Sequence, residues 1–315
     1  MDVVRGAAVL LIVVFHATVF VEQYGGLTAP RWIAEVNTVV TPLRIPLLIL
    51  LSGVLLGQSI RKGRHRYFSG KLRNVAWPYL VWATVWGALS WPVYSLLGYA
   101  LGGSYLWFLL YLLSFYCLAW FLRGVPAELV GVVAVIASVL APEGTLNAER
   151  WPYLFALFML GHLLTARPRL RQWLFASPWA LPAAAVLLTL HLALGLGYGY
   201  GLESALFTIA VGTLIMRAAR AYGSARPLRP LRFVGRNSLV FYAAHYPLMA
   251  GAAIGARAAG VSSAALLWVV LLVVAIVGSA VLARWRQHPP ISWLFTAPRP
   301  HLSRGLTTPT RPSRQ

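Results

Sequence analysis

The sequence is poor in the residues that soluble proteins use for surface charge and covalent cross-links. Only seven of its 315 residues are Asp or Glu, charged residues of both signs make up 11%, and there is one cysteine. A soluble domain carries about 25% charged residues, so this composition excludes an ordinary soluble fold. The single Cys117 cannot form an intramolecular disulfide and matches no metal-binding pattern. We expect it to pack as a small buried hydrophobe.

Common catalytic motifs are also absent. The sequence contains no HExxH zinc motif, no Walker loop, no GxSxG elbow and no glycine-rich dinucleotide fingerprint. Metal-dependent and nucleotide-hydrolysing chemistry therefore have no support. No internal repeat is visible, so the inverted-repeat signature of many transporters is missing as well.

The chain is rich in apolar runs, and 59% of its residues are hydrophobic. Several runs approach the 20 or so residues that a helix needs to cross a bilayer. The sequence thus predicts an all-α integral membrane protein with about ten transmembrane helices. The weakest of these, 127–141, is either re-entrant or tilted against its neighbours. The predicted spans are 6–22, 38–57, 76–98, 105–122, 127–141, 152–166, 178–196, 200–216, 236–256 and 263–283.

The positive charge follows the predicted loops. The formal net charge is +20, and most Lys and Arg residues fall in one set of alternate loops, whereas the opposite loops hold only Arg31, Arg150 and Arg257. Cytoplasmic loops are enriched in Lys and Arg, so we predict that both termini are cytoplasmic. We reject nucleic acid as the partner and expect the lipid bilayer instead, with an anionic headgroup or cofactor phosphate compatible at the cytoplasmic face.

No polar segment is long enough to form a second core, so we predict one integral domain over residues 1–285. The Pro- and Arg-rich tail over 286–315 lacks an apolar period. We expect this cytoplasmic tail to be disordered beyond a short membrane-proximal stretch.

The first apolar run contains three ionisable residues, Asp2, Arg5 and His16. At about 100° per residue, the eleven positions from Arg5 to His16 bring both side chains to one stripe of a helix, about 16 Å apart along its axis, and Asp2 joins that stripe. Ionisable groups inside a membrane usually mark a pathway or a reaction centre. A neutral histidine there can serve as a general base. The structural alternative is an interfacial Asp2–Arg5 pair with a hydrogen-bonded His16.

A second apolar run, TPLRIPLLILLSGVLLG (41–57), contains Arg44 between two prolines, followed by Ser52 and Gly53. Proline can free backbone carbonyls, and glycine permits close helix approach. By the predicted orientation, Arg44 and His16 lie at similar depth in the outer half of the membrane, so we expect them to share a cavity. Alternatively, Arg44 snorkels to the interface.

Two further stretches contain candidate site residues. Ser238, Tyr242 and His245 have the i, i+4, i+7 spacing of one helix face, within GRNSLVFYAAHYPLM. Trp107 lies in the aromatic stretch YLWFLLYLL. The structural alternatives are interhelical hydrogen bonding for the first group and an aromatic belt at the interface for Trp107.

Together these stretches resemble the membrane acyltransferase 3 family of multi-pass O-acyltransferases. The opening DVVRGAAVLLIVVFH is similar to the start of that family, and further similar blocks follow in the family's order: RIPLLILLSGVLLG, KLRNVAWPYLVW, YLWFLLYLLSFY and GRNSLVFYAAHYPLM. The chain departs from the family at Leu47–Ile49, where Phe is usual. Family members usually begin upstream of the residue that matches Asp2, which leaves the completeness of the N-terminus open.

The resemblance implies transfer of an acyl group, with acetyl favoured, from cytoplasmic acyl-coenzyme A to a hydroxyl of a sugar, polysaccharide or natural product. Acyl-CoA would be a co-substrate, with no permanently bound cofactor. In that picture His16 takes the hydroxyl proton, and Arg5, oriented by Asp2, faces the donor. Arg73 and Arg236 are candidates for the coenzyme phosphates.

The same resemblance leaves Arg44 either to stabilise the oxyanion or to hold the acceptor. Donor or acceptor binding is the role expected for Ser52, Trp107, Ser238, Tyr242 and His245. The resemblance also implies a multi-pass protein of the bacterial cytoplasmic membrane. The alternative function is a proton-coupled transporter or flippase for an anionic or glycosylated solute. A non-catalytic scaffold would give no reason for a base and a cation on one stripe inside lipid.

Overall fold

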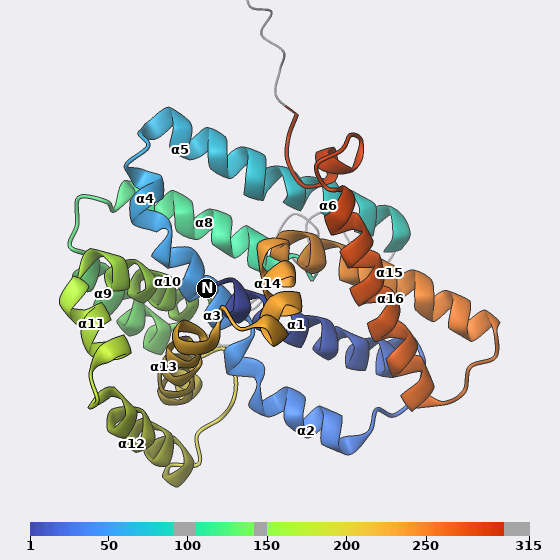
Figure 1. Ribbon diagram of the computed structural model, residues 1–315, viewed down its shortest axis with the longest axis horizontal. Helices are drawn as coiled ribbons and strands as arrows, with labels where there is room; N and C mark the ends of the chain where they lie inside the picture. Colours follow the sequence, from blue (N-terminus) through green and yellow to red (C-terminus); the bar gives the residue numbers. More distant parts are fainter. Residues whose placement is uncertain (91–104, 142–149, 299–315) are drawn as a thin grey trace, which may run out of the picture.

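The computed structural model describes residues 1–90, 105–141 and 150–298, and every regular element in these ranges is helical (Figure 1). Part of the predicted span 76–98 and the tail beyond residue 298 lie outside them. The elements are α1 (Asp2–Gln23), α2 (Arg31–Val39), η1 (Thr41–Leu43), α3 (Ile45–Val54), α4 (Leu56–Ile60), α5 (Arg64–Lys71), η2 (Leu72–Ala76), α6 (Trp77–Ser90), α8 (Trp107–Phe121), α9 (Ala127–Leu140), α10 (Arg150–Ala166), α11 (Pro168–Ala176), α12 (Ala180–Ala193), η3 (Leu202–Ser204), α13 (Ala205–Tyr222), η4 (Arg226–Leu228), α14 (Arg229–Arg236), α15 (Ser238–Ala258), α16 (Ala264–Trp285) and η5 (Ile291–Leu294).

Several of these helices can cross a membrane. In the described ranges, α1, η3 with α13, α15 and α16 are long and apolar enough to span a bilayer. Two more spans result if each bent pair counts as one, namely α2 with η1–α3, bent by 48°, and α11 with α12, bent by 79°. The chain is therefore an all-helical membrane protein within the described ranges. The count of ten spans and the sides of the termini stay predictions.

The outer surface of α16 has the composition expected beside lipid. Leu266, Val269, Val273, Val277 and Val281 are each about half exposed and recur every three or four residues along one face. In water such a stripe would be an exposed apolar patch, whereas hydrocarbon tails satisfy it. The opposite face of α16 packs on α1 and α15.

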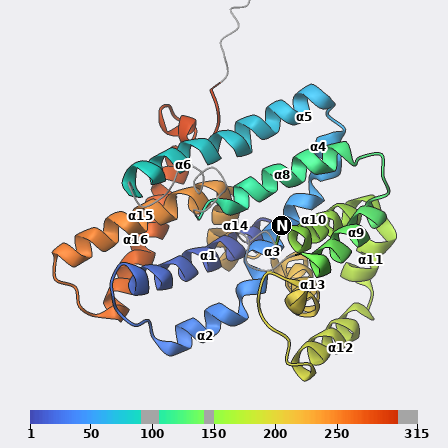
Figure 2. The same ribbon diagram turned by 180° about the vertical axis from the view of Figure 1, so that it is seen from behind.

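Helix α1 lies at the centre of the molecule and packs against α3, α14, α15 and α16 (Figure 1). Figure 2 shows the same centre from behind, with α12 at the edge of the molecule in both views.

The backbones of α1 and α14 touch where two glycines meet. A methyl group at Gly6 would overlap the carbonyl oxygen of Leu231, and one at Gly235 would overlap that of Asp2. This crossing brings Arg236 to the first turn of α1.

Helices α3 and α10 cross in the same way, which confirms the close helix approach predicted at Gly53. A methyl group at Gly53 would overlap the carbonyl oxygen of Phe158, and one at Gly161 would overlap that of Leu50. Small residues allow such contact between membrane helices because backbone dispersion contacts replace side-chain packing.

The end of the described chain folds back onto α6. Arg73 donates from Nε and Nη2 to the carbonyl oxygen of Ala297, at 3.2 and 2.9 Å. The indoles of Trp77 and Trp82 donate to the carbonyl oxygens of Trp293 and Leu294, and Phe295 is buried with its ring centroid 5.5 Å from that of Trp82. Residues 286–298 thus form a strap that ties α16 to α6. The domain boundary predicted at 285 stays a prediction.

Candidate functional site

Two histidines from distant parts of the chain meet at the centre of the bundle. His16 lies on the fourth turn of α1, and His245 lies on the second turn of α15, where it is fully buried. Nε2 of His245 is 3.0 Å from Nδ1 of His16. The sequence placed both residues on polar faces of membrane helices, and the packing of α1 against α15 joins them.

The hydrogen bonds of this pair fix which nitrogens carry protons. Nδ1 of His245 lies 3.0 Å from the carbonyl oxygen of Phe241, and Nδ1 of His16 lies 3.1 Å from that of Ile12. A carbonyl oxygen only accepts, so each Nδ1 of the neutral rings bears the hydrogen. Nε2 of His245 is then an acceptor for the Nδ1–H of His16. Nε2 of His16 keeps its lone pair and has no hydrogen-bond partner among the described residues.

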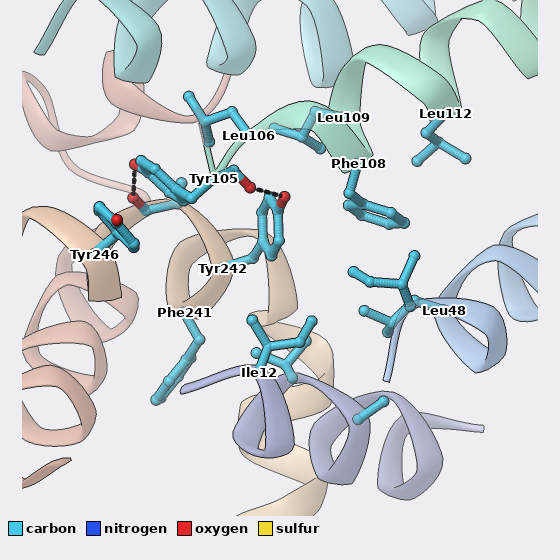
Figure 3. Packing of buried hydrophobic residues seen from close by; sticks show 14 of the residues in the cluster. Ile12, Leu48, Tyr105, Leu106, Phe108, Leu109, Leu112, Phe241, Tyr242 and Tyr246 are labelled. Atoms are coloured by element: carbon cyan, nitrogen blue, oxygen red, sulfur yellow. Dashed lines mark hydrogen bonds between the residues drawn. The ribbon is translucent and has the colours of Figure 1, made fainter. Parts of the chain in front are cut away.

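Aromatic rings enclose the histidine pair. The Tyr246 ring lies 5.1 Å from that of His16 and stacks on Tyr105 at 4.5 Å. Tyr105 and Tyr242 fasten the start of α8 to α15: Tyr242 donates to the Tyr105 carbonyl and Tyr105 to the Ala243 carbonyl, both at 2.6 Å (Figure 3). Buried tyrosines whose hydroxyls are satisfied in this way hold the surroundings of His16 rigid.

His16 opens onto a cavity of about 280 Å³. This volume is close to the lower end of ordinary ligand pockets, about 300 Å³. The lining combines one base, two arginines and several aromatic rings, and no acidic side chain is among the described residues that form it. These residues are Ile12, Phe15, His16, Thr41, Arg44, Ile45, Tyr105, Trp107, Arg150, Gly199, Tyr200 and Tyr242.

Arg44 reaches this cavity from a non-helical position between two helical segments. It occupies the residue between η1 and α3, four residues beyond Val40, where the α2–α3 pair bends by 48°. Pro42 and Pro46 lie on either side of Arg44. Proline has no backbone N–H, so it cannot donate the hydrogen bonds that would continue a regular helix through Arg44. The predicted span over 38–57 begins just before this bend, and α2 precedes most of that span.

The guanidinium of Arg44 is 2% exposed and makes few contacts with polar groups. Its Nη2 donates to the Thr41 hydroxyl and, at 3.2 Å, to the Asn37 carbonyl oxygen. Its carbon Cζ lies 4.2 Å from the centre of the Phe15 ring. The centre of the His16 ring lies 5.1 Å from the centre of the same Phe15 ring. Nε and Nη1 have no hydrogen-bond partner. Arg44 therefore does not snorkel to the surface, and it lines the same cavity as His16, as the depth argument predicted.

The position of α2 depends on a polar link. Asn37 donates from Nδ2 to the Thr18 hydroxyl at 3.0 Å, and that hydroxyl also accepts from the Trp268 indole at 3.3 Å. Helices α1, α2 and α16 are thus joined two residues from His16. The sequence analysis did not single out Asn37 or Thr18, although their polarity within apolar segments was a signal.

The N-terminal end of α1 differs from the expectation. Asp2 pairs with Nε of Arg236 at 3.2 Å, not with Arg5, because α14 crosses α1 at this point. Arg236 is thereby engaged by a carboxylate, and Arg73 is engaged by the strap. Neither arginine lines the His16 cavity, so the geometry gives no support to their expected role as phosphate ligands.

Arg5 and Ser52 instead lie near a different residue, Tyr116 of α8. The Tyr116 hydroxyl donates to the Ser52 carbonyl at 3.5 Å, and Arg5 is close enough to this hydroxyl to act on it electrostatically. Nζ of Lys71 lies 3.3 Å above the Tyr116 ring. We call the group formed by Arg5, Lys71 and Tyr116 the inner basic cluster. Lys71 and Tyr116 were not predicted as site residues, because they are distant in sequence from His16.

The other predicted residues divide between the cavity and its surroundings. Trp107 and Tyr242 line the cavity, and His245 contacts its base from behind. Ser238 begins α15 and is not part of the lining. Arg150 and Tyr200, which the sequence analysis did not select, complete the wall, with the Arg150 guanidinium 5.5 Å from the Tyr200 ring.

A second, larger cavity of about 720 Å³ opens beside the first residues of α1. Its described lining includes Arg171 and Arg220 but no histidine, cysteine or carboxylate. No group of three His, Cys, Asp or Glu residues that could hold a metal occurs in the described ranges. Of these two cavities, the one beside His16 is therefore the one whose described lining contains an acid–base residue.

Comparison with protein families identifies the class of membrane protein to which this chain belongs. A family model described as an acyltransferase domain, that of the acyltransferase 3 family, matches residues 1–284. The chain belongs to the acyltransferase 3 family and is a membrane acyltransferase. No curated protein and no solved structure gave a match.

Proposed function

We propose that the protein transfers an acyl group, acetyl by family resemblance, from acyl-coenzyme A to a hydroxyl of a sugar, polysaccharide or natural product. We place it in the bacterial cytoplasmic membrane, with the donor taken from the cytoplasm. In this proposal Nε2 of His16 accepts the hydroxyl proton while the hydroxyl oxygen attacks the thioester carbonyl. Collapse of the tetrahedral intermediate breaks the carbon–sulfur bond, and the imidazolium returns its proton to the leaving thiolate.

The observation that carries this proposal is the state of His16. The Ile12 carbonyl and Nε2 of His245 both accept from Nδ1 of His16, and the Phe241 carbonyl fixes His245 in the matching tautomer, so the free lone pair of His16 belongs to Nε2. The same logic orients the base in serine hydrolases, where a partner on Nδ1 fixes the tautomer. An aromatic cage and an arginine complete the lining of the cavity.

The donor would approach along the stripe of α1 that carries Arg5. Arg5 and Lys71 place two cations near Tyr116, a few turns from His16 on the same side of α1. Cations at this position suit the phosphates of coenzyme A. The inner basic cluster replaces Arg73 and Arg236 in our assignment of the donor site.

One observation favours the transporter alternative. Broken membrane helices often form substrate sites in transporters, and Arg44 lies four residues beyond such a break at Val40. A transporter would move solute across sealed vesicles without consuming an acyl thioester. An acyltransferase releases free thiol at a rate that depends on both donor and acceptor.

The first experiment measures thiol release from acetyl-CoA by purified protein in detergent with a mixture of hydroxylated acceptors. We expect His16→Ala to lower the rate by at least about 100-fold, the usual contribution of a general base. His65→Ala is the matched control, because His65 is an exposed histidine of α5. Equal rates for wild type and His16→Ala would contradict the mechanism, provided both variants elute as folded protein in size-exclusion chromatography.

A further inference from the structure

The cavity beside His16 contains a buried cation that the chain itself leaves largely unpaired. A guanidinium has five N–H donors. The two on Nη2 of Arg44 are used by Asn37 and Thr41. Those on Nε and Nη1 have no partner at ordinary hydrogen-bond distance, and the neutral Tyr200 hydroxyl beside the guanidinium supplies no counter-charge. Such a group is costly to bury without an anion. Since Arg44 lines the cavity, its unused donors are available to a bound molecule.

Other charges around the cavity have the same sign. Arg150 also lines it, and both arginines interact electrostatically with Tyr200, which lies in the same wall. The described loop that carries Tyr200 has one acidic residue, Glu203, but its carboxylate accepts a hydrogen bond from the backbone of Gly201 at 3.1 Å, and Glu203 is absent from the lining. The described lining of the cavity therefore includes two arginines and no carboxylate.

The remaining walls suit a sugar ring. Trp107, Tyr105, Tyr200 and Tyr242 present aromatic surfaces from three elements, and the volume of about 280 Å³ accommodates roughly one ring. His16 and Arg44 both contact the Phe15 ring, so a molecule bound there meets the base and the cation together.

We propose that this cavity selects an acceptor that carries a carboxylate, a sugar acid whose hydroxyl faces His16 and whose carboxylate pairs with Arg44. This inference deepens the proposed acyl transfer and rests on it. It assigns Arg44 to binding of the acceptor's charge, the second of the two roles left open by the sequence. Stabilisation of the reaction's oxyanion is the competing role.

The test compares glucuronate with glucose, which share their ring hydroxyls and differ by a carboxylate in place of a hydroxymethyl group. Wild type, Arg44→Gln and the control Arg257→Gln, an exposed arginine on α15, are assayed in detergent. Binding is followed by tryptophan fluorescence, because Trp107 lines the cavity, and turnover by thiol release from acetyl-CoA. Trp107→Phe checks that the fluorescence signal arises there.

We expect wild type and Arg257→Gln to bind glucuronate at least tenfold more tightly than glucose and to show the same preference in kcat/KM. Arg44→Gln should lose that preference both in binding and in kcat/KM. Equal use of both sugars by wild type would overturn the inference and leave acyl transfer standing. An equal loss of rate with both sugars in Arg44→Gln would overturn it in favour of the oxyanion role. Arg44-dependent glucuronate binding without any thiol release would overturn acyl transfer and the acceptor assignment together.

Discussion

At the scale of single residues, the function of His16 depends on its neighbour. A histidine can present either ring nitrogen to a substrate, and the partner of the other nitrogen decides which one is free. His245 supplies that partner at 3.0 Å and is itself fixed by the Phe241 carbonyl. In the proposed mechanism His245 is a positioning residue, because it contacts His16 and is absent from the described lining of the cavity.

Replacing His245 tests this role. We expect His245→Phe to lower kcat by about 10- to 100-fold, comparable to the loss of an orienting partner at other sites, with the KM for acetyl-CoA unchanged. His245→Gln keeps an acceptor for the Nδ1–H of His16 and should retain more activity than the Phe variant. The measurement is steady-state thiol release, and wild-type kcat in His245→Phe would contradict the positioning role.

If the inner basic cluster binds the donor as we propose, Lys71 makes donor binding dependent on pH. Burial, with a smaller contribution from the nearby Lys62 charge, lowers the pKa of the Lys71 ammonium to about 8. Lys71 ends α5, between the second and third predicted spans. The side chain is a cation below this pH and becomes neutral above it, so its attraction for phosphate is lost as the pH rises.

We therefore expect the KM for acetyl-CoA to rise about fivefold to tenfold between pH 7 and pH 9, the loss of one charge-assisted hydrogen bond. Lys71→Arg stays charged over this range and should show a flatter KM profile. A KM rise of equal size in both proteins would show that Lys71 does not hold the donor. The readout is KM from initial rates at each pH, with kcat recorded separately.

At the scale of elements, backbone contacts between helices set the positions of the site residues. The α3–α10 crossing holds the helix that follows Arg44, and the α1–α14 crossing holds the helix that carries His16. Both depend on glycine pairs in which any side chain would overlap a carbonyl oxygen of the partner helix. The site therefore depends on residues that never touch it.

Substitution at one crossing has a clear expected effect. Gly53→Ala should destabilise the protein by about 1–3 kcal/mol, the usual cost of overpacking, and lower its melting temperature in detergent. Gly251→Ala is the matched control, because a methyl group at this α15 glycine meets no atom. There the change should be neutral or stabilise by up to about 1 kcal/mol, since alanine is the better helix former. Equal melting temperatures for wild type and Gly53→Ala would contradict the close packing.

At the scale of the whole molecule, the strap joins parts of the chain that are far apart in sequence. Its carbonyl oxygens accept hydrogen bonds from Arg73, Trp77 and Trp82, so α6 is tied to the end of α16. The resemblance suggested a phosphate-binding role for Arg73. The geometry gives this arginine a structural one.

The two roles of Arg73 predict different measurements. Arg73→Ala should lower the melting temperature by several degrees, because two hydrogen bonds to the strap are lost, while the KM for acetyl-CoA stays within about twofold of wild type. Phe295→Ala should lower the melting temperature through the same strap by removing a buried ring. A large rise in KM for Arg73→Ala with no thermal change would restore the phosphate-binding role.

Much of this protein could be predicted from its sequence because the responsible signals are local. Apolar runs without charges require a membrane, and the all-helical class follows because backbone groups in lipid must bond within their own segment. The spacing of Arg5 and His16 depends only on helix geometry, and the four similar blocks after the N-terminal one indicated the acyltransferase 3 family over most of the chain.

Only the tertiary structure decided which of these residues meet. The contact of His16 with His245 joins residues 229 positions apart, and Asp2 pairs with Arg236 because two glycines let α14 touch α1. The burial of Arg44, the docking of Arg73 and the position of Lys71 over Tyr116 likewise depend on packing between distant segments. Periodicity gives the face on which a side chain lies, but it does not give the helix that this face will contact.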